Sequence, residues 1–136
     1  MEEKLTINRR LLLVAGLLGS TSLIAPGLAR AEARLTVVNV SAWNCPYCVK
    51  WTNTYKADWL ASAEHGKVRY VEIESPTFKQ AYAEKYWPDD LKPLLKQIGG
   101  TGTPRFLIVR DGGIVSNQAG LNRWAFVLDD LRKMLA

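Results

Sequence analysis

The chain is poor in the residues that build metal centres and disulfide frameworks. Its 136 residues include two cysteines, Cys45 and Cys48, and one histidine, His65. A structural zinc site requires four ligands, and this set falls short of that number. A purely structural disulfide between Cys45 and Cys48 is a further alternative, but so short a loop restricts the unfolded chain very little. We therefore expect no metal and no bound cofactor, and look to thiol chemistry instead.

The chain also lacks a concentration of charge of one sign. Its formal net charge is +5, of which residues 1–31 carry +2, and the remaining lysines and arginines are scattered along the chain. A nucleic-acid surface needs a basic stripe with aromatic residues between the charges, so we predict no nucleic-acid partner. With 48% hydrophobic residues and a length of 136, a single folded domain is expected.

No apolar run is long enough to predict a transmembrane helix. The uninterrupted run Leu11–Leu18 is far shorter than the roughly 20 residues that a span requires. It follows the basic pair Arg9 and Arg10, and small residues occur at "ARA" (29–31) and "AEA" (31–33). This order is typical of an export signal.

We therefore predict an export signal over residues 1–31, with cleavage near Ala31 or Ala33, and a mature domain over residues 32–136 in the periplasm. An uncleaved anchor is the alternative. The paired arginines resemble a twin-arginine signal, although Leu11 replaces the usual Phe, so general and twin-arginine export both stay open.

The mature chain alternates strand and helix patterns. The β-branched run 34–40, the alternating segment 67–74, the apolar run 105–110 and the segment 113–118 after Asp111-Gly112-Gly113 predict strands. Helices are predicted from Pro46 to about Ala63, over Lys79–Tyr86, over Asp89–Ile98 and over residues 122–135. The order βαβα-ββα predicts an α/β fold with a mixed four-stranded sheet flanked by helices.

The two cysteines fall where the first strand gives way to the first helix. Pro46 suits the first helical position, so Cys45 is expected at the N-cap, where unsatisfied N–H groups and the helix dipole favour a thiolate. Cys48 lies one turn further on the same side. This arrangement predicts an exposed nucleophile at Cys45, a more buried resolving thiol at Cys48, and thiol–disulfide exchange between them.

The motif "CPYC" at a helix start, followed by "TGTPRFLIV" before a hairpin, resembles the thioredoxin superfamily over residues 34–136. The resemblance implies a thioredoxin-like fold, a redox-active Cys45–Cys48 pair, and a cis peptide bond at Thr103-Pro104 opposite the cysteines. Backbone groups of Thr103 and Pro104, with Trp43 and Tyr47, are then expected to bind an extended substrate. The chain is also similar to small periplasmic thioredoxin-like proteins attached to sulfur-oxidation systems.

The sequence departs from this family at two places near the cysteines. Where thioredoxins carry a buried proton-relaying carboxylate, this chain has Asn39, which does not titrate. Glu72 and Glu74 are replacement candidates by location alone. The tryptophan that normally adjoins the first cysteine is shifted to Trp43, with Asn44 in between.

The direction of exchange is inferred from what surrounds the motif. Strong oxidases of this superfamily insert a helical domain and often place histidine between the cysteines, whereas this chain has Tyr47 and two modest helices. Periplasmic isomerases add a dimerisation domain for which residues 32–136 leave no room. We therefore predict a monomeric reductase of disulfides or mixed thiol adducts on an exported protein, recharged by a membrane electron donor. Oxidase- or isomerase-type exchange, and a non-enzymatic interaction module with a structural disulfide, are the alternatives.

Overall fold

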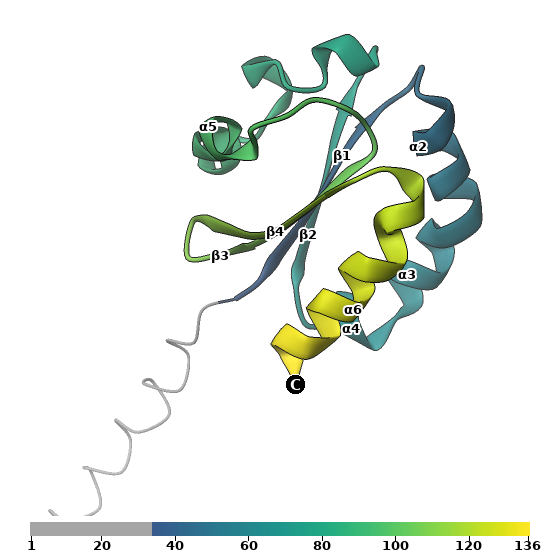
Figure 1. The fold of residues 1–136 in the computed structure, drawn as a ribbon, viewed down its shortest axis with the longest axis vertical. Coiled ribbons are helices and arrows are strands. Elements are labelled where there is room, and N and C mark those ends of the chain that lie inside the picture. The colour runs from purple at the N-terminus through teal and green to yellow at the C-terminus, as the bar shows by residue number, and fades with distance from the viewer. Residues whose placement is uncertain (1–33) are drawn as a thin grey trace, which may run out of the picture. The chain divides into compact units, whose positions relative to one another are not determined.

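The strands form one mixed, twisted sheet (Figure 1). The structure is a computed structural model and describes residues 34–136, so the export signal predicted for residues 1–31 lies outside the described part. The strands are β1 (Thr36–Ala42), β2 (Arg69–Ser75), β3 (Arg105–Arg110) and β4 (Gly113–Ala119), in the order β2-β1-β3-β4. β1 pairs with β2 in parallel, and the other two pairings are antiparallel. The predicted four-stranded mixed sheet is confirmed.

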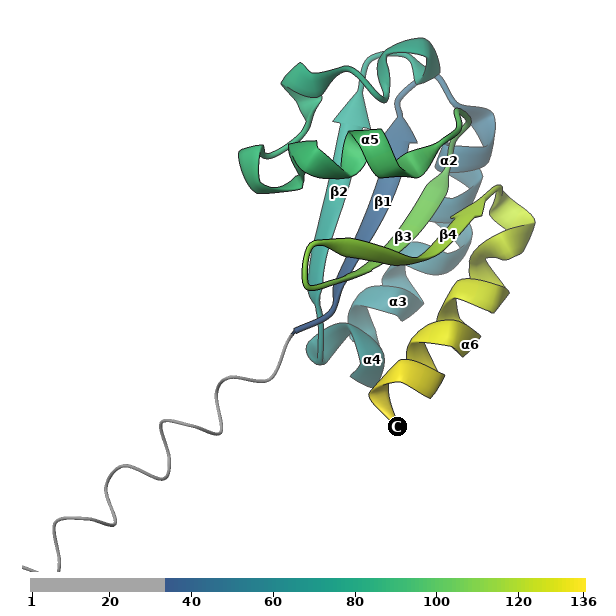
Figure 2. The ribbon, with the colours of Figure 1, turned by 60° about the vertical axis from the view of Figure 1, so that its left-hand side comes forward.

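Side-chain alternation along β1 divides the core into two layers. Val37 packs on one face of the sheet with Trp51 and Trp124, which come from the helices α2 (Pro46–Trp51) and α6 (Trp124–Leu135). Val38 packs on the other face with residues of the segment 76–102, which carries α5 (Leu95–Ile98). Figure 2 shows α2, α3 (Ala57–Ala61) and α6 on one side of the sheet and α5 on the other. Because β1 is central, it is buried from both sides, and its end holds the cysteine motif firmly.

The helix predicted from Pro46 to about Ala63 exists, but it ends earlier than predicted. α2 continues through a π-helical turn, Thr52–Lys56, into α3, and Ser62 then adopts an extended conformation with ψ 155°. The hydroxyl oxygen of Ser62 accepts a hydrogen bond from the His65 N–H at 3.2 Å and so caps a separate short helix, α4 (Ala63–Gly66). An N-cap serine satisfies a free N–H at a helix start, which explains why the break comes at this residue.

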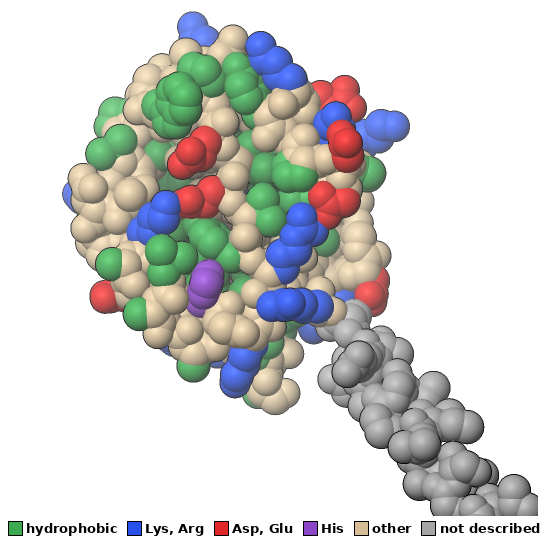
Figure 3. All heavy atoms as spheres, turned by 180° about the vertical axis from the view of Figure 1, so that it is seen from behind, with side chains coloured by type: hydrophobic (Ala, Val, Ile, Leu, Met, Phe, Trp, Pro, Cys, Tyr) green, Lys and Arg blue, Asp and Glu red, His purple; other side chains and the backbone are tan. Residues whose placement is uncertain are grey.

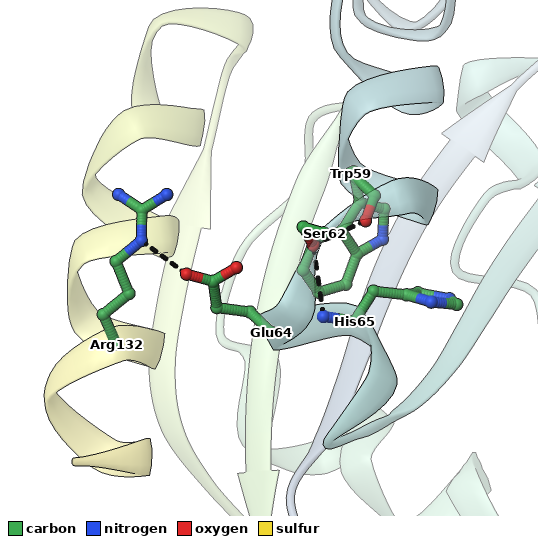
Figure 4. Close-up of polar contacts among 5 residues, drawn as sticks. All are labelled: Trp59, Ser62, Glu64, His65 and Arg132. Atoms are coloured by element: carbon green, nitrogen blue, oxygen red, sulfur yellow. Dashed lines mark hydrogen bonds and ion pairs between the residues drawn. The ribbon is translucent and has the colours of Figure 1, made fainter.

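Figure 4 shows how this short helix is fixed. The Ser62 hydroxyl donates to the Trp59 carbonyl at 2.6 Å, and Arg132 of α6 bonds Glu64 at 2.8 Å between Nε and Oε1. The guanidinium of Arg132 lowers the pKa of the Glu64 carboxyl. These contacts join the end of the first helical segment to the closing helix.

The two helices predicted before Pro104 are largely wrong. The segment Lys79–Tyr86 contains two 3-10 turns, Phe78–Gln80 and Glu84–Tyr86, instead of an α-helix. The indole Nε1 of Trp87 donates to the Ala81 carbonyl at 2.9 Å, which occupies an acceptor that a continuing helix would use. The buried tryptophan therefore replaces the helical bond.

The second of these helices is α-helical only at its end. Asp89–Leu94 is 3-10 and only Leu95–Ile98 (α5) is α-helical. Pro93 lies inside this segment and has no N–H for an α-helical bond. α5 ends at Gly99, whose φ of 66° is left-handed.

The closing helix α6 lies within the segment 122–135 that was predicted as a helix. Trp124, Val127 and Leu131 are buried against the sheet. Within residues 34–136, no helix is both long enough and apolar enough to span a bilayer.

Candidate active site

Cys45 and Cys48 lie where β1 passes into α2. Cys45 is the N-cap of α2 with an extended backbone (φ −92°, ψ 110°), and Pro46 stands at the helix start. The Sγ of Cys45 accepts a hydrogen bond from the Cys48 N–H at 3.2 Å. The two residues are joined as a disulfide with a Cα–Cα distance of 5.2 Å. The predicted N-cap position is confirmed, and with it the contact between the sulfur and the N–H groups of the first turn, which favours negative charge on sulfur.

The prediction that Cys45 is exposed and Cys48 more buried is wrong in its first part. Cys45 is 4% exposed and Cys48 is 2% exposed, so accessibility hardly separates them. The two cysteines differ instead in what they face.

Cys45 faces the loop that precedes β3. Its Sγ lies 3.5 Å from the Thr103 carbonyl oxygen. The Thr103–Pro104 peptide bond is cis, and the Pro104 carbonyl accepts from the Gly120 N–H at 2.8 Å, which ties the loop to the end of β4. The structure thus places Thr103 and Pro104 beside the cysteine pair, although they are more than fifty residues away in sequence.

Cys48, unlike Cys45, lines a small pocket of about 200 Å³. The pocket lies between the end of β1, the start of the helical layer and β2. It is lined by Ser41, Ala42, Trp43, Cys48, Val49, Thr52 and Glu74. A pocket of this size with polar walls has room for water.

Trp43 and Tyr47 lie on the surface at the motif, with exposed fractions of 67% and 63%. Neither side chain is therefore part of the core. A third exposed aromatic residue joins them: the backbone N–H of Phe78 donates to the Asn44 side-chain oxygen at 2.7 Å, and Phe78 is 47% exposed. Sequence analysis missed Phe78 because the contact to Asn44 spans 34 residues.

A second residue missed by sequence analysis is Arg105, which immediately follows the proline. Its side chain is buried, and it donates to the Tyr82 hydroxyl at 2.8 Å and to the Thr101 carbonyl at 2.7 Å. It also donates to Asn117 on β4 at 2.6 Å. A Cβ added at Gly100 would lie 2.9 Å from Nη2 of Arg105, so the loop approaches the guanidinium closely.

The Tyr82 hydroxyl extends this network to the loop before β3. It donates to the Gly102 carbonyl at 2.5 Å. Burial raises the pKa of Tyr82, and the neighbouring Arg105 opposes that rise. The loop that carries Thr103 is therefore held from two sides by side chains, and no periodicity in the sequence signals this.

Asn39 is buried at the position where the family resemblance implies a carboxylate. It is 2% exposed, its Nδ2 lies 3.5 Å from the Tyr70 hydroxyl, and its Oδ1 has no partner within the described residues. Burial is the main cause that raises the pKa of Tyr70. Of the two acidic candidates, Glu72 forms an ion pair with Lys56 at 2.7 Å, whereas Glu74 is exposed and lines the Cys48 pocket.

Within residues 34–136 no group of three metal-binding side chains comes together. His65 packs edge-on against the rings of Trp59 and Tyr70, with ring centroids 5.2 Å and 5.7 Å apart. The histidine is accounted for as part of this aromatic cluster.

Comparison with known proteins agrees with this fold. A family model described as thioredoxin matches residues 28–88. Residues 34–136 form a thioredoxin-like domain. A search of curated protein sequences finds no match at the significance required.

Solved thioredoxins resemble this thioredoxin-like domain in fold. Thioredoxin f from spinach chloroplast is 15% identical with a TM-score of 0.53, and the match covers 82% of this chain and 85% of that one. A thioredoxin f2, solved in complex with ferredoxin:thioredoxin reductase, is 18% identical with a TM-score of 0.52, and the match covers 82% and 86%. The periplasmic thioredoxin SoxS from Paracoccus pantotrophus is 15% identical over 75% and 94% of the two chains, but its TM-score of 0.49 supports no functional inference.

The thioredoxin-like domain thus carries a C-x-x-C pair at the start of its first helix. This combination supports thiol–disulfide oxidoreductase activity.

Proposed function

We propose that this protein is an exported thiol–disulfide oxidoreductase that reduces disulfides or mixed thiol adducts on another exported protein. One observation carries the proposal: Cys45 caps α2 with its sulfur against N–H groups and 3.5 Å from the Thr103 carbonyl. A sulfur in that position is favoured as a thiolate and lies beside the Thr103–Pro104 segment, along which we propose that an extended chain aligns. Thr103, Pro104, Trp43 and Tyr47 are the proposed substrate-binding residues.

The reaction transfers two electrons from the dithiol form to the substrate. The Cys45 thiolate attacks one sulfur of the substrate disulfide, forms a mixed disulfide and releases the first substrate sulfur as a thiolate. Cys48 then attacks the Sγ of Cys45, which releases the second substrate sulfur and leaves the Cys45–Cys48 disulfide. A donor dithiol must reduce that disulfide before the next turnover.

The proposed partners follow from this cycle. The substrate is an exported protein with a disulfide or mixed adduct, and the donor is a membrane protein that supplies a dithiol. Thioredoxin f2 has been solved in complex with a reductase, and for the present chain we propose a donor that likewise supplies electrons. Periplasmic location, a cleaved signal, a monomer and an association with sulfur oxidation remain proposals from the sequence.

The alternative of a different class is an interaction module in which the disulfide is structural. The exposed aromatic side chains Trp43, Tyr47 and Phe78 around the motif favour it, because such residues anchor protein interfaces. An enzyme of this kind needs the same surface to hold its substrate, so exposure alone does not separate the two.

Reduction of insulin by dithiothreitol separates them. We expect residues 34–136 to accelerate the precipitation of reduced insulin, and Cys45→Ser to abolish the acceleration. Tyr55→Phe, a change outside the cysteine motif, is the matched control and keeps it. Equal turbidity with and without the wild-type domain would establish the interaction module instead.

A further inference from the structure

The resolution step needs a group that removes the proton of Cys48, and the buried polar residues near the pair are unsuited to it. Asn39 is an amide and has no proton-accepting form at neutral pH. The phenol of Tyr70, which lies against Asn39, is kept protonated because burial raises its pKa. The proton of Cys48 must therefore leave by another route.

Two carboxylates, those of Glu72 and Glu74, lie on the same face of β2, because alternate residues of a strand point to the same face. Glu72 is opposite Asn39 in the β1–β2 register, and Glu74 is opposite Ser41, nearer to the end of β1 that carries the cysteines. Glu72 is held by Lys56 at 2.7 Å. Glu74 makes neither an ion pair nor a side-chain hydrogen bond with any residue of the described part.

Glu74 and Cys48 line the same pocket. Thr52 also lines it, and Cys45 does not. In the view from behind, acidic side chains lie among basic and hydrophobic ones on the surface (Figure 3). A polar pocket of about 200 Å³ accommodates water that bridges two groups too far apart to touch.

We propose that Glu74 is the proton acceptor for Cys48 during the release of substrate, and that the proton crosses the pocket through water. This inference rests on the proposed reductase function and adds the acid–base partner of its second step. It places the carboxylate on β2 instead of β1, in a pocket that Thr103 does not line.

The step balances as follows. In the mixed disulfide, the Cys48 S–H gives its proton to the Glu74 carboxylate, and the resulting thiolate attacks the Sγ of Cys45. The Cys45–Cys48 bond forms as the bond from Cys45 to the substrate sulfur breaks, and that sulfur leaves with the electron pair. The substrate thiolate is protonated by solvent, and Glu74 returns its proton to solvent through the same open pocket.

The charged and titratable groups around this path are few. β2 contributes Glu72 and Tyr70, the π-helical turn contributes Lys56, and α2 contributes Cys48 itself. β1 contributes Asn39 and Ser41, which do not titrate in this range. Lys56 already bonds Glu72, which leaves Glu74 as the carboxylate of this face with no basic partner in the described part.

A chromogenic aryl disulfide, 5,5′-dithiobis(2-nitrobenzoate), resolves the two steps. The fully reduced domain releases one coloured thiolate when Cys45 attacks and a second when Cys48 attacks, and stopped flow follows each. We expect Glu74→Gln to slow the second release at neutral pH by at least about tenfold and to move its pH midpoint upward, with the first release unchanged. This is less than the ~10²–10⁴-fold that general-base catalysis contributes, because solvent reaches the pocket.

Matched variants separate a proton route from a structural role. Glu72→Gln, on the same face of β2, is expected to leave the second release within about twofold of wild type, and Glu74→Asp is expected to restore most of it. A second release with the wild-type pH profile in Glu74→Gln, or a slower one in Glu72→Gln instead, would overturn the assignment to Glu74. Failure of the wild-type domain to give the first release would overturn the reductase function itself, which is a different result.

Discussion

At the scale of single residues, position along one helical turn gives the two cysteines unequal chemistry. Both are almost fully buried, yet only Cys45 has its sulfur against the N–H of the first turn and against Thr103. Burial alone raises a thiol pKa, whereas N–H donors and the helix terminus lower it. The assignment of the nucleophile therefore depends on contacts and not on exposure.

We expect the Cys45 thiol in the Cys48→Ser variant to have a pKa below about 8.5, the value of a free cysteine, because the helix terminus favours its thiolate. The rate of alkylation by iodoacetamide against pH measures it. The complementary variant Cys45→Ser reports on Cys48 and should titrate at higher pH. Faster labelling of Cys48 than of Cys45 at neutral pH would reverse the assignment.

Tyr70 provides a second residue-scale prediction, in the pH dependence of stability. Burial raises its pKa in the folded state, while in the unfolded chain a tyrosine titrates near 10. A raised folded pKa contributes stability that is complete below pH ~10 and is lost as the pH rises above it. The Tyr70→Phe variant should therefore lose free energy of unfolding less steeply above pH 10, by about 1.4 kcal/mol per pH unit.

Urea unfolding at several pH values from about 9 to about 11.5, on both sides of the ordinary tyrosine pKa of about 10, measures how the free energy of unfolding changes with pH. Tyr47→Phe is the matched control, since that side chain is exposed in the folded protein, and its slope should equal the wild-type slope. A Tyr70→Phe slope identical to wild type would mean that the phenol ionises freely in the folded state.

At the scale of elements, the loop before β3 is held by side chains and not by regular structure. Arg105 has acceptors on three separate segments, at Tyr82, Thr101 and Asn117. Hydrogen bonds made by a charged donor are stronger than neutral ones, so the buried guanidinium fixes the loop that places Thr103 beside Cys45.

The Arg105→Met variant should therefore lose about 2 kcal/mol or more of the free energy of unfolding, because it removes three hydrogen bonds made by a buried charged group. Arg110→Met is the matched control at the exposed end of the same strand, and it should change stability by no more than about 0.5 kcal/mol. Urea denaturation measures both. Equal stabilities of the two variants would show that the loop is held by other contacts.

Sequence patterns predicted some helices and strands correctly and others wrongly. The four strands and α6 were predictable from local patterns. β1 and β3 are apolar runs, β2 alternates apolar and charged residues, β4 follows a turn signal, and α6 has apolar residues at helical spacing. The segment before Pro104 was not, because the bond from the Trp87 indole to the Ala81 carbonyl replaces a helical bond and depends on tertiary packing. Phe78 and Arg105 were not predicted as residues near the site for the same reason, because their contacts join segments that are distant in sequence.

At the scale of the whole molecule, the domain places two different environments on either side of one disulfide. Cys45 faces the loop before β3, where Thr103 lies, and Cys48 faces the pocket that reaches β2. Substrate attack and proton release are then separated in space. The cysteine motif was predictable from sequence because its spacing is local, whereas this division required the fold.

The surroundings of the pair also set its expected reduction potential. Tyr47 is neutral and exposed, so it stabilises the Cys45 thiolate less than a protonated histidine would. Equilibration of the domain with glutathione buffers should give a potential nearer to that of glutaredoxins, about −200 to −230 mV, than to the strongest oxidases near −120 mV. A potential at the oxidase value would make disulfide formation the better description of the activity.

The central claim is that Cys45 exchanges disulfides with a protein substrate and that Cys48 resolves the product. Incubation of the Cys48→Ser variant with a disulfide-containing peptide, followed by mass spectrometry without reductant, tests it most directly. We predict a covalent adduct at Cys45 that persists in this variant, does not accumulate in the wild-type domain, and does not form in Cys45→Ser. No adduct in Cys48→Ser, or an equal adduct on Cys48 in Cys45→Ser, would contradict the account.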